Sequence, residues 1–346
     1  MQDNYFSQLL QVYLIAEIGV NHNGDMGLAR EMVLAAKRAG ADAVKFQTFT
    51  AAALVTRSTP KVRYQQDTTS RDESHYEMIR KLELGKPEHR DLTDYCATVG
   101  VDFLSTPYDI DSAKFLAELG VKMFKTASAD LVDLPLQQYI ASTGKPAIVA
   151  TGMAGLGEVE QVANIFEKAG NPHLVLLHCV SNYPCSDASL NLRAMNTLTH
   201  ALGLPVGYSD HSEGFLAAVI SVSLGAKVLE KHFTLDKSLP GPDHKASSTP
   251  DEFAELVQNV RRAERMLGSP RKARQAEECQ MAEVSRKSLV LARAMRGGET
   301  VTIGDLRLMR PGTGIPSNFI PQVEGLRLKA DLEALHQLCW SDLEGL

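Results

Sequence analysis

The sequence contains no hydrophobic run that approaches the roughly 20 residues needed to cross a lipid bilayer. No arginine or lysine precedes Arg30, so the start of the chain lacks the basic region of a secretory signal peptide. The net charge is −6, and the lack of a positive excess disfavours nucleic acid and anionic membranes as partners. These absences predict a cytoplasmic protein that binds neither a membrane nor nucleic acid.

Cysteine is scarce, because the 346 residues contain only five and no two of them form a C-x-x-C pair. An odd number of widely spaced cysteines disfavours a disulfide framework and a zinc site built from thiolates. We therefore expect free thiols in a reducing compartment. The five are Cys96, Cys179, Cys185, Cys279 and Cys339.

From residue 12 onward, short apolar runs alternate with longer amphipathic stretches, a pattern typical of a parallel sheet with crossover helices. Eight such units over about 260 residues predict a (β/α)8 TIM barrel over residues 1–268, although an open doubly wound sheet has the same periodicity. Glycines follow several amphipathic stretches, where left-handed helix caps are expected. The expected strands are residues 13–18, 42–47, 101–105, 121–126, 146–151, 173–179, 204–209 and 226–232; the expected helices include 26–39, 88–99, 111–119, 157–169 and 213–224, with caps at Gly40, Gly100, Gly120, Gly170 and Gly225.

Three regions depart from this alternation. Residues 51–83 contain Pro60 and a polar run, so we expect a long loop over the strand ends, either a lid or a solvated surface excursion. Residues 269–284 are rich in charge and are expected to form a linker. Residues 285–346 contain short alternating pieces at 288–292 and 300–303 with two glycines between them, which predict a turn within a small, mainly β module.

Polar side chains follow the ends of the predicted strands, where a barrel of this kind carries its catalytic groups. Lys45 and Lys125 fall at the ends of the second and fourth strands, and Gln47 shares the face of Lys45 because alternate residues of a strand point to the same side. Hydroxyl side chains such as Thr106 and Ser128 accompany the lysines. In a chain of net negative charge, this combination suits a phosphate or a carboxylate.

Two histidines, His211 and His232, fall at the ends of the seventh and eighth predicted strands. Parallel strands deliver their carboxyl ends to one face, so the two imidazoles can meet on one divalent cation, with the carboxylate of Asp243 within reach. Two imidazoles and a carboxylate suit Mn²⁺ or a similar metal. The alternative is that both are core histidines with satisfied hydrogen bonds.

Several runs at these strand ends are distinctive in composition. They are residues 16–24 (AEIGVNHNG), 44–49 (VKFQTF), 103–107 (FLSTP), 151–153 (TGM), 207–211 (GYSDH), 230–234 (EKHFT) and 240–243 (PGPD), with 310–312 (RPG) in the last module. Together they resemble the bacterial sialic acid synthases, which carry a C-terminal antifreeze-like (SAF) domain. The similarity spans nearly the whole chain, with the runs in the same order.

The resemblance implies a TIM barrel joined to a SAF domain at residues 285–346, assembled as a domain-swapped homodimer. It also implies a metal-dependent condensation of phosphoenolpyruvate (PEP) with open-chain N-acetylmannosamine, giving N-acetylneuraminate and phosphate by cleavage of the C–O bond of PEP. A legionaminate synthase that uses 2,4-diacetamido-2,4,6-trideoxymannose is the alternative, with pseudaminate synthesis behind it. The implied catalytic residues are Glu17, Tyr183 and Asp243; the substrate-binding residues are Lys45, Gln47, Thr106, Lys125, Ser128, Asp130, Ser181, Ser209 and Arg310; the ligands of Mn²⁺ or Mg²⁺ are His211 and His232.

Departures from the family pattern at Asp130, Ala150 and Ser181 leave the acceptor sugar open. Glu17 is the expected base or charge stabiliser for the attacking water, with Asp243 or a metal-bound water as alternatives. Two other classes of protein stay open as well. One is a non-catalytic sugar-binding protein, and the other is a barrel aldolase or isomerase that forms a Schiff base on one of the two lysines.

Overall fold

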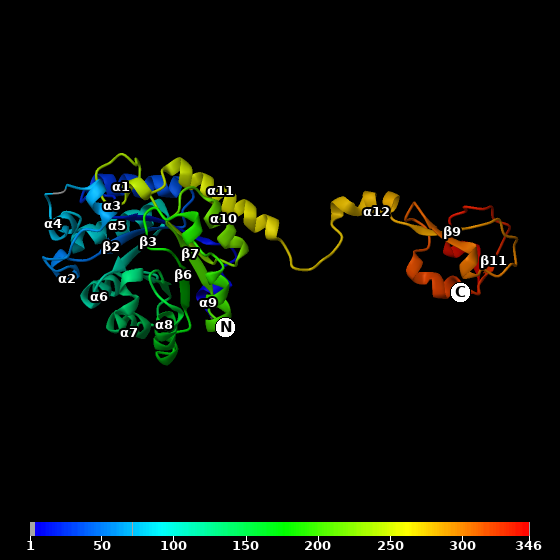
Figure 1. Ribbon diagram of the computed structural model, residues 1–346, viewed down its shortest axis with the longest axis horizontal. Helices are drawn as coiled ribbons and strands as arrows, with labels where there is room; N and C mark the ends of the chain where they lie inside the picture. Colours follow the sequence, from blue (N-terminus) through cyan, green and yellow to red (C-terminus); the bar gives the residue numbers. More distant parts are fainter. Residues whose placement is uncertain (1–3, 71, 346) are drawn as a thin grey trace. The chain divides into compact units, whose positions relative to one another are not determined.

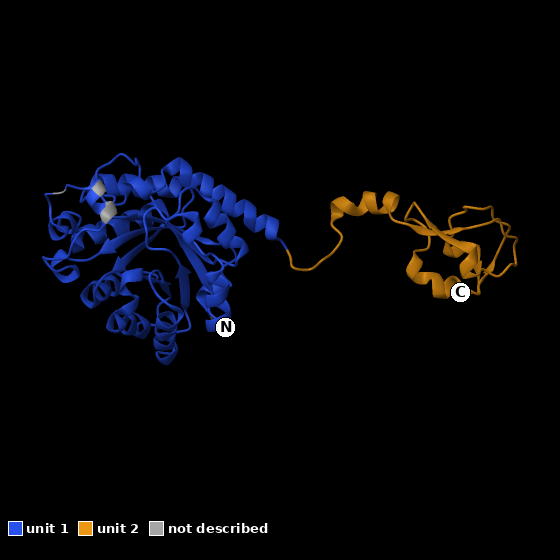
Figure 2. Ribbon diagram, viewed as in Figure 1, with its two compact units in different colours: residues 1–268 blue, residues 269–346 orange. Residues whose placement is uncertain are grey.

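The computed structural model describes residues 4–70 and 72–345 and divides into two compact units, Met1–Gly268 and Ser269–Leu346 (Figure 2). Each unit has a hydrophobic core of its own. Within the described residues, no helix is both long and apolar enough to span a membrane.

The first unit is a barrel of eight parallel strands surrounded by helices (Figure 1). The strand order is β3-β2-β1-β8-β7-β6-β5-β4, and the two strands at the ends of this order, β3 and β4, contact each other. The sheet therefore nearly closes on itself, which confirms the predicted TIM barrel and rejects the open doubly wound sheet. The strands are β1 (Tyr13–Gly19), β2 (Ala43–Thr48), β3 (Asp102–Pro107), β4 (Phe124–Thr126), β5 (Ala147–Ala150), β6 (Leu174–His178), β7 (Val206–Asp210) and β8 (Val228–His232).

The helices of the barrel bury an apolar face against the strands and expose a more polar face to solvent. In α1, for example, Ala29, Met32 and Val33 are buried, and the side chain of Asp25 caps the first turn. The glycines expected to end helices adopt positive φ, among them Gly100 at 76° and Gly120 at 84°. The helices are α1 (Met26–Arg38), α5 (Lys86–Val99), α6 (Ile110–Leu119), α7 (Leu134–Ser142), α8 (Leu156–Lys168), α9 (Ala194–Leu202), α10 (Leu216–Ser223) and α11 (Pro250–Leu267).

The segment between β2 and α5 is not the continuous loop that its polar sequence predicts, because it contains the short helices α2 (Ala51–Leu54), α3 (Arg63–Thr68) and α4 (His75–Arg80). Ser74 and Glu77 form a capping box at the start of α4, which satisfies backbone groups that would otherwise need water. A small apolar cluster, formed by residues of the segment together with residues outside it, gives the segment a packed face. Its members are Val20, Phe49 and Leu82, with Leu54, Ile79 and Tyr108 packed against them.

The interior of the barrel is apolar near the start of the strands and charged near their ends. Alternate residues of a strand point to the same side, so Ile15 pairs with Ala43, and Glu17 pairs with Lys45 two residues later. Phe6, in the 3-10 helix η1 (Tyr5–Gln8), is fully buried in the apolar cluster near the N-terminal ends of the strands. The charged side chains are therefore confined to the C-terminal ends of the strands.

The second unit contains two small antiparallel sheets. In these, β9 (Ser288–Leu291) pairs with β10 (Leu306–Met309), and β11 (Arg327–Leu328) pairs with β12 (Leu343–Glu344). The predicted turn is present at Gly297 and Gly298. The two pieces that flank this turn do not pair with each other, because β9 pairs with β10 and the main chain of Val301 bonds to Gly325 and Leu326. The expected linker contains the first residues of the short helix α12 (Cys279–Ser285), and α13 (Ile320–Val323) lies later in the unit.

Candidate active site

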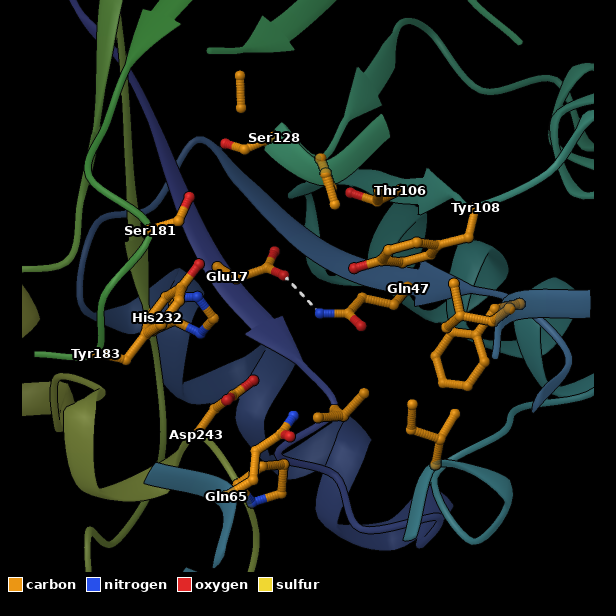
Figure 3. Close-up of a pocket in the computed structure, with 18 of the residues that line it drawn as sticks. Glu17, Gln47, Gln65, Thr106, Tyr108, Ser128, Ser181, Tyr183, His232 and Asp243 are labelled. Atoms are coloured by element: carbon orange, nitrogen blue, oxygen red, sulfur yellow. Dashed lines mark hydrogen bonds between the residues drawn. The ribbon is translucent and has the colours of Figure 1, made fainter. Parts of the chain in front are cut away.

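A cavity of about 740 Å³ lies at the C-terminal ends of the barrel strands. Its size is in the range of small-molecule sites, and its position is where barrel enzymes carry their chemistry. Figure 3 shows Glu17 and Gln47 near its centre, with Ser128 and Ser181 to one side and Asp243 to the other. The predicted site residues that line it are Glu17, Lys45, Gln47, Thr106, Lys125, Ser128, Ser181, Tyr183, Ser209, His211, His232 and Asp243.

Two predicted site residues are not among the residues that line the cavity. Asp130, in the 3-10 helix η2 (Ser128–Val132), is absent from the lining of the cavity, and its backbone carbonyl accepts a hydrogen bond from Gln137. Burial, reinforced by Asp133, raises the pKa of Asp130 to about 7. Arg310 directly follows β10 in the second unit. Their contacts with a substrate therefore stay predictions.

Four buried charges of alternating sign form the floor of the cavity. Lys45 Nζ lies 2.6 Å from Glu17 Oε2 and 3.8 Å from Glu230 Oε2. Lys125 Nζ lies 3.3 Å from Glu230 Oε1, so Glu230 joins the two lysines. Lys45 also donates to Thr106 Oγ1 at 3.0 Å. None of the four charged side chains is more than 5% exposed, so their interactions are only weakly screened by water.

Glu230 is the central residue of this floor, although no role was predicted for it from the sequence. It lies two residues before His232 on β8, so the alternation of the strand places both side chains on the inner face. Ser209 Oγ donates to Glu230 Oε1 at 3.0 Å and holds it in place. Lys231, between the two, points away from the interior and pairs with Asp210 at 2.8 Å. The alternation of side chains along β8 was the sequence signal that indicated an inward-facing Glu230.

The two buried carboxyl groups have opposite acid–base behaviour. Burial raises the pKa of Glu17 above its ordinary value, and the nearby Lys45 offsets only part of that rise. Burial acts on Glu230 as well, but Lys125 and Lys45 outweigh it and hold the pKa of this carboxyl below its ordinary range. Glu230 therefore stays ionised, whereas Glu17 is suited to exchange a proton near neutral pH. Asp243 is a second candidate, because burial raises its pKa to about 6.

The hydroxyls of Ser128 and Ser181 converge beside Gly152. Ser128 Oγ accepts a hydrogen bond from the backbone N–H of Gly152 at 3.0 Å, and Ser181 Oγ is buried without a hydrogen-bond partner in the described part of the chain. A Cβ atom on Gly152 would lie 2.4 Å from Ser181 Oγ and 2.8 Å from Ser128 Oγ, so only glycine permits this approach. Hydroxyl and N–H donors at such spacing suit the oxygens of an anion.

The two predicted metal ligands lie side by side with Tyr183. The ring centroids of His211 and His232 are 5.7 Å apart, and the Tyr183 ring lies 4.2 Å from the first and 5.5 Å from the second. His211 Nδ1 lies 2.7 Å from the carbonyl oxygen of Val180, which can only accept, so Nδ1 carries the proton and Nε2 keeps its lone pair. His232 Nδ1 is buried and has no hydrogen-bond partner among the described residues.

These features fit a divalent metal held by two imidazoles. Burial lowers the pKa of both histidines, so both rings are in the neutral form that binds metals. The described residues contain no group of three or more His, Cys, Asp or Glu side chains that could hold a metal ion. The predicted ligands are the two histidines alone, so the other positions around a metal would fall to water or substrate oxygens.

Family comparisons agree with this geometry. The NeuB family model matches residues 32–272, and the SAF domain model matches residues 286–344. The chain belongs to the NeuB family. An N,N'-diacetyllegionaminic acid synthase from Legionella pneumophila is 45% identical to this NeuB-family chain over 336 residues, covering 96% of this chain and 94% of the relative. An enzyme of the same name from Campylobacter jejuni is 42% identical over 304 residues, covering 87% and 91%.

A solved structure is also similar to this NeuB-family protein. The N-acetylneuraminic acid synthetase of Leptospira borgpetersenii, crystallised with citrate, matches with a TM-score of 0.70 and 34% identity over 79% of this chain and 90% of that one. The predicted family, the barrel and the SAF domain are thus confirmed. The relatives are synthases of nonulosonic acids, and this NeuB-family protein is an enzyme of the same type.

Proposed function

We propose that the protein condenses PEP with an open-chain N-acylated mannosamine-type sugar and releases a nine-carbon 2-keto acid and phosphate. The observation that carries this proposal is the pair of buried lysines beside two neutral imidazoles at the strand ends. Buried ion pairs contribute little to stability, which favours a functional role for the cluster that these lysines form with Glu17 and Glu230. Both lysines line the cavity, so their ammonium groups can bind an anion with several oxygens in addition to the two carboxylates. PEP, with its phosphate and carboxylate, is an anion of this kind.

The acceptor that we propose is 2,4-diacetamido-2,4,6-trideoxymannose, which would make the product N,N'-diacetyllegionaminate. The sequence alone favoured N-acetylmannosamine. The two relatives reported above are N,N'-diacetyllegionaminic acid synthases and share more than 40% of their residues with this chain over most of its length. Their names support the diacetamido sugar, and N-acetylmannosamine becomes the competing acceptor.

The residues of the cavity have separate tasks in this reaction. Lys45 and Lys125, with the hydroxyls of Ser128 and Ser209, would bind the phosphate and carboxylate of PEP. The C3 carbon of PEP forms a bond to the aldehyde carbon of the acceptor, water adds to C2, and the C2–O bond to phosphate breaks. Because its pKa is raised, Glu17 would accept the proton of that water. A divalent ion at the two histidines would supply a Lewis acid for the aldehyde oxygen.

The test of the proposed function is phosphate release measured with each substrate alone and with both together. Phosphate should appear only when PEP, an N-acylated mannosamine and Mn²⁺ or Mg²⁺ are all present, and the sugar product should retain the oxygen of solvent water at C2. Phosphate release that needs no sugar would contradict the proposal. A Schiff base trapped on Lys45 or Lys125 by borohydride would instead support the aldolase alternative, which the 2.6 Å ion pair of Lys45 with Glu17 disfavours.

For the second unit, we propose that Arg310 reaches the acyl group of the acceptor in the barrel of a partner subunit. Arg310→Ala should then raise the KM for the acceptor by about 100-fold, the loss expected for a buried charged hydrogen bond, and leave the KM for PEP unchanged. Mixing this variant with Lys45→Met should restore activity, because one chain supplies an intact barrel and the other an intact arginine.

The yield of the mixed sample is predictable. With equal amounts of both chains and random pairing, half of the dimers are mixed and each contains one complete site, so activity should return to about a quarter of the wild-type value. Failure to regain activity after the subunits have been exchanged by refolding would place Arg310 in the site of its own chain or outside any site.

A further inference from the structure

The segment between β2 and α5 contributes mainly apolar residues to the cavity, with Gln65 and His75 as polar exceptions, and the proposed chemistry does not use these apolar residues. Leu54 and Ile79 line the cavity from α2 and α4, and both are only partly buried. Val20, Phe49 and Leu82 also line the cavity, are at most 8% exposed, and form the cluster against which Leu54 and Ile79 pack. We refer to these five residues as the apolar wall.

The apolar wall lies away from the metal-binding histidines. Phe49 packs edge-on against Tyr108 with the ring centroids 5.8 Å apart, so the wall adjoins Tyr108. Figure 3 shows Tyr108 and Gln47 across the cavity from Tyr183 and His232, with Glu17 between them. A substrate whose reacting carbon lies near Glu17 and the histidines would therefore direct its far end toward the apolar wall.

The apolar wall is built to keep its shape. Helices α2 and α4 contact each other, so Leu54 and Ile79 come from neighbouring helices. The backbone N–H of Ala51, at the start of α2, donates to the side chain of Glu83, which ties the helix to the chain beyond α4. A preformed apolar surface binds apolar groups without an ordering cost.

Such a surface discriminates between the two acceptors. N-acetylmannosamine carries hydroxyl groups at C4 and C6, and a hydroxyl placed against leucine and isoleucine loses its hydrogen bonds to water without replacement. The diacetamido sugar carries an acetamido methyl at C4 and a methyl at C6, which gain from leaving water. We propose that Leu54 and Ile79 bind the methyl-bearing C4–C6 side of the acceptor and thereby select a 4-acetamido-6-deoxy sugar. The inference rests on the proposed function.

The experiment compares kcat/KM for the two acceptors in the full-length protein and in the variants Leu54→Asn and Ile79→Asn. The wild type should prefer the diacetamido sugar, and each variant should lower kcat/KM for it by about 10- to 200-fold, the range for a lost methyl contact. The kcat/KM for N-acetylmannosamine should stay within about threefold of the wild-type value or rise, because asparagine can form a hydrogen bond with a hydroxyl group of this sugar. The KM for PEP should not change.

A matched control is Leu10→Asn, which makes the same change at a side chain that is fully exposed, 100% by area. It should leave both acceptors unaffected. If an asparagine variant loses PEP binding as well, it has a folding defect, and Ile79→Val then carries the test. A smaller preference for the diacetamido sugar in Ile79→Val supports the inference, and an unchanged preference overturns it.

The inference and the proposed function fail in different ways. Variants that lower kcat/KM equally for both acceptors, or a wild type that uses both equally well, would show that the apolar wall does not select the acceptor, although the synthase activity would stand. A wild type that releases no phosphate from PEP with either sugar would remove the proposed function itself.

Discussion

The variant Lys45→Met should lose about 10³-fold in kcat/KM for PEP, because it removes a charge that the reaction needs at every stage. The ammonium group of Lys45 lies 2.6 Å from Glu17 and donates to Thr106 at 3.0 Å, and only 4% of the side chain is exposed. Methionine keeps an unbranched side chain that is one heavy atom shorter, and it removes the ammonium group with its charge and hydrogen bonds. Steady-state kinetics with PEP as the varied substrate measure the effect.

The same change should also lower the free energy of unfolding. Without Lys45, the carboxylates of Glu17 and Glu230 lose the ammonium group that both of them contact. Breaking a buried ion pair costs about 3–5 kcal/mol, unless one of the two carboxylates takes up a proton. The double variant Glu17→Gln, Lys45→Met should recover most of this stability in denaturant titrations and none of the activity. Recovery of activity in the double variant would show that Lys45 serves only to neutralise Glu17.

A surface lysine provides the matched control. Lys122 forms an ion pair with Asp102, but its side chain is 67% exposed, so the Coulomb attraction is screened by water. Lys122→Met should therefore change neither kcat/KM nor the denaturation midpoint beyond experimental error. A loss of activity in Lys122→Met comparable to that of Lys45→Met would mean that removal of a positive charge anywhere on the barrel is enough.

The floor of the site could be predicted from the sequence because strand geometry is regular. Residues at the ends of parallel strands gather at one face, and alternate residues point to one side, which is enough to bring Lys45, Lys125 and His232 together. Glu230 follows from the same rule, since it lies on the inner face of β8 with His232. It was not among the predicted site residues because the resemblance implied no role for the first residue of the EKHFT run.

The apolar wall could not be predicted in this way. Residues 51–83 have a polar composition and no clear periodicity, so the sequence indicates a loop. Their helices depend on contacts with Val20 and Phe49, which lie outside the segment and become neighbours only when the barrel has folded. The turn at Gly297 and Gly298 was predicted correctly, but the pairing of β9 with β10 was not predicted, because it depends on tertiary contacts.

Removal of divalent metal should lower the rate of phosphate release by about 10⁴-fold, since a Lewis acid at the aldehyde oxygen contributes several kcal/mol to the transition state. The prediction assumes that His211 and His232 bind the metal. His232 Nδ1 is buried without a hydrogen-bond partner in the described residues, and His211 Nδ1 donates to the carbonyl oxygen of Val180, which leaves Nε2 of His211 as the ligand atom. Treatment with a chelator should abolish turnover, and Mn²⁺ or Mg²⁺ should restore it.

Metal binding itself gives a readout that does not depend on turnover. Calorimetric or paramagnetic titration of the chelator-treated protein with Mn²⁺ should show one site, and His211→Asn or His232→Asn should weaken it by at least about 100-fold. His200→Asn, which changes an exposed histidine on α9, should bind Mn²⁺ as the wild type does. Full phosphate release by the chelator-treated protein would show that the lysines and Glu17 catalyse the condensation without a metal. Unchanged Mn²⁺ affinity in both site variants would show that the two histidines are not the metal ligands.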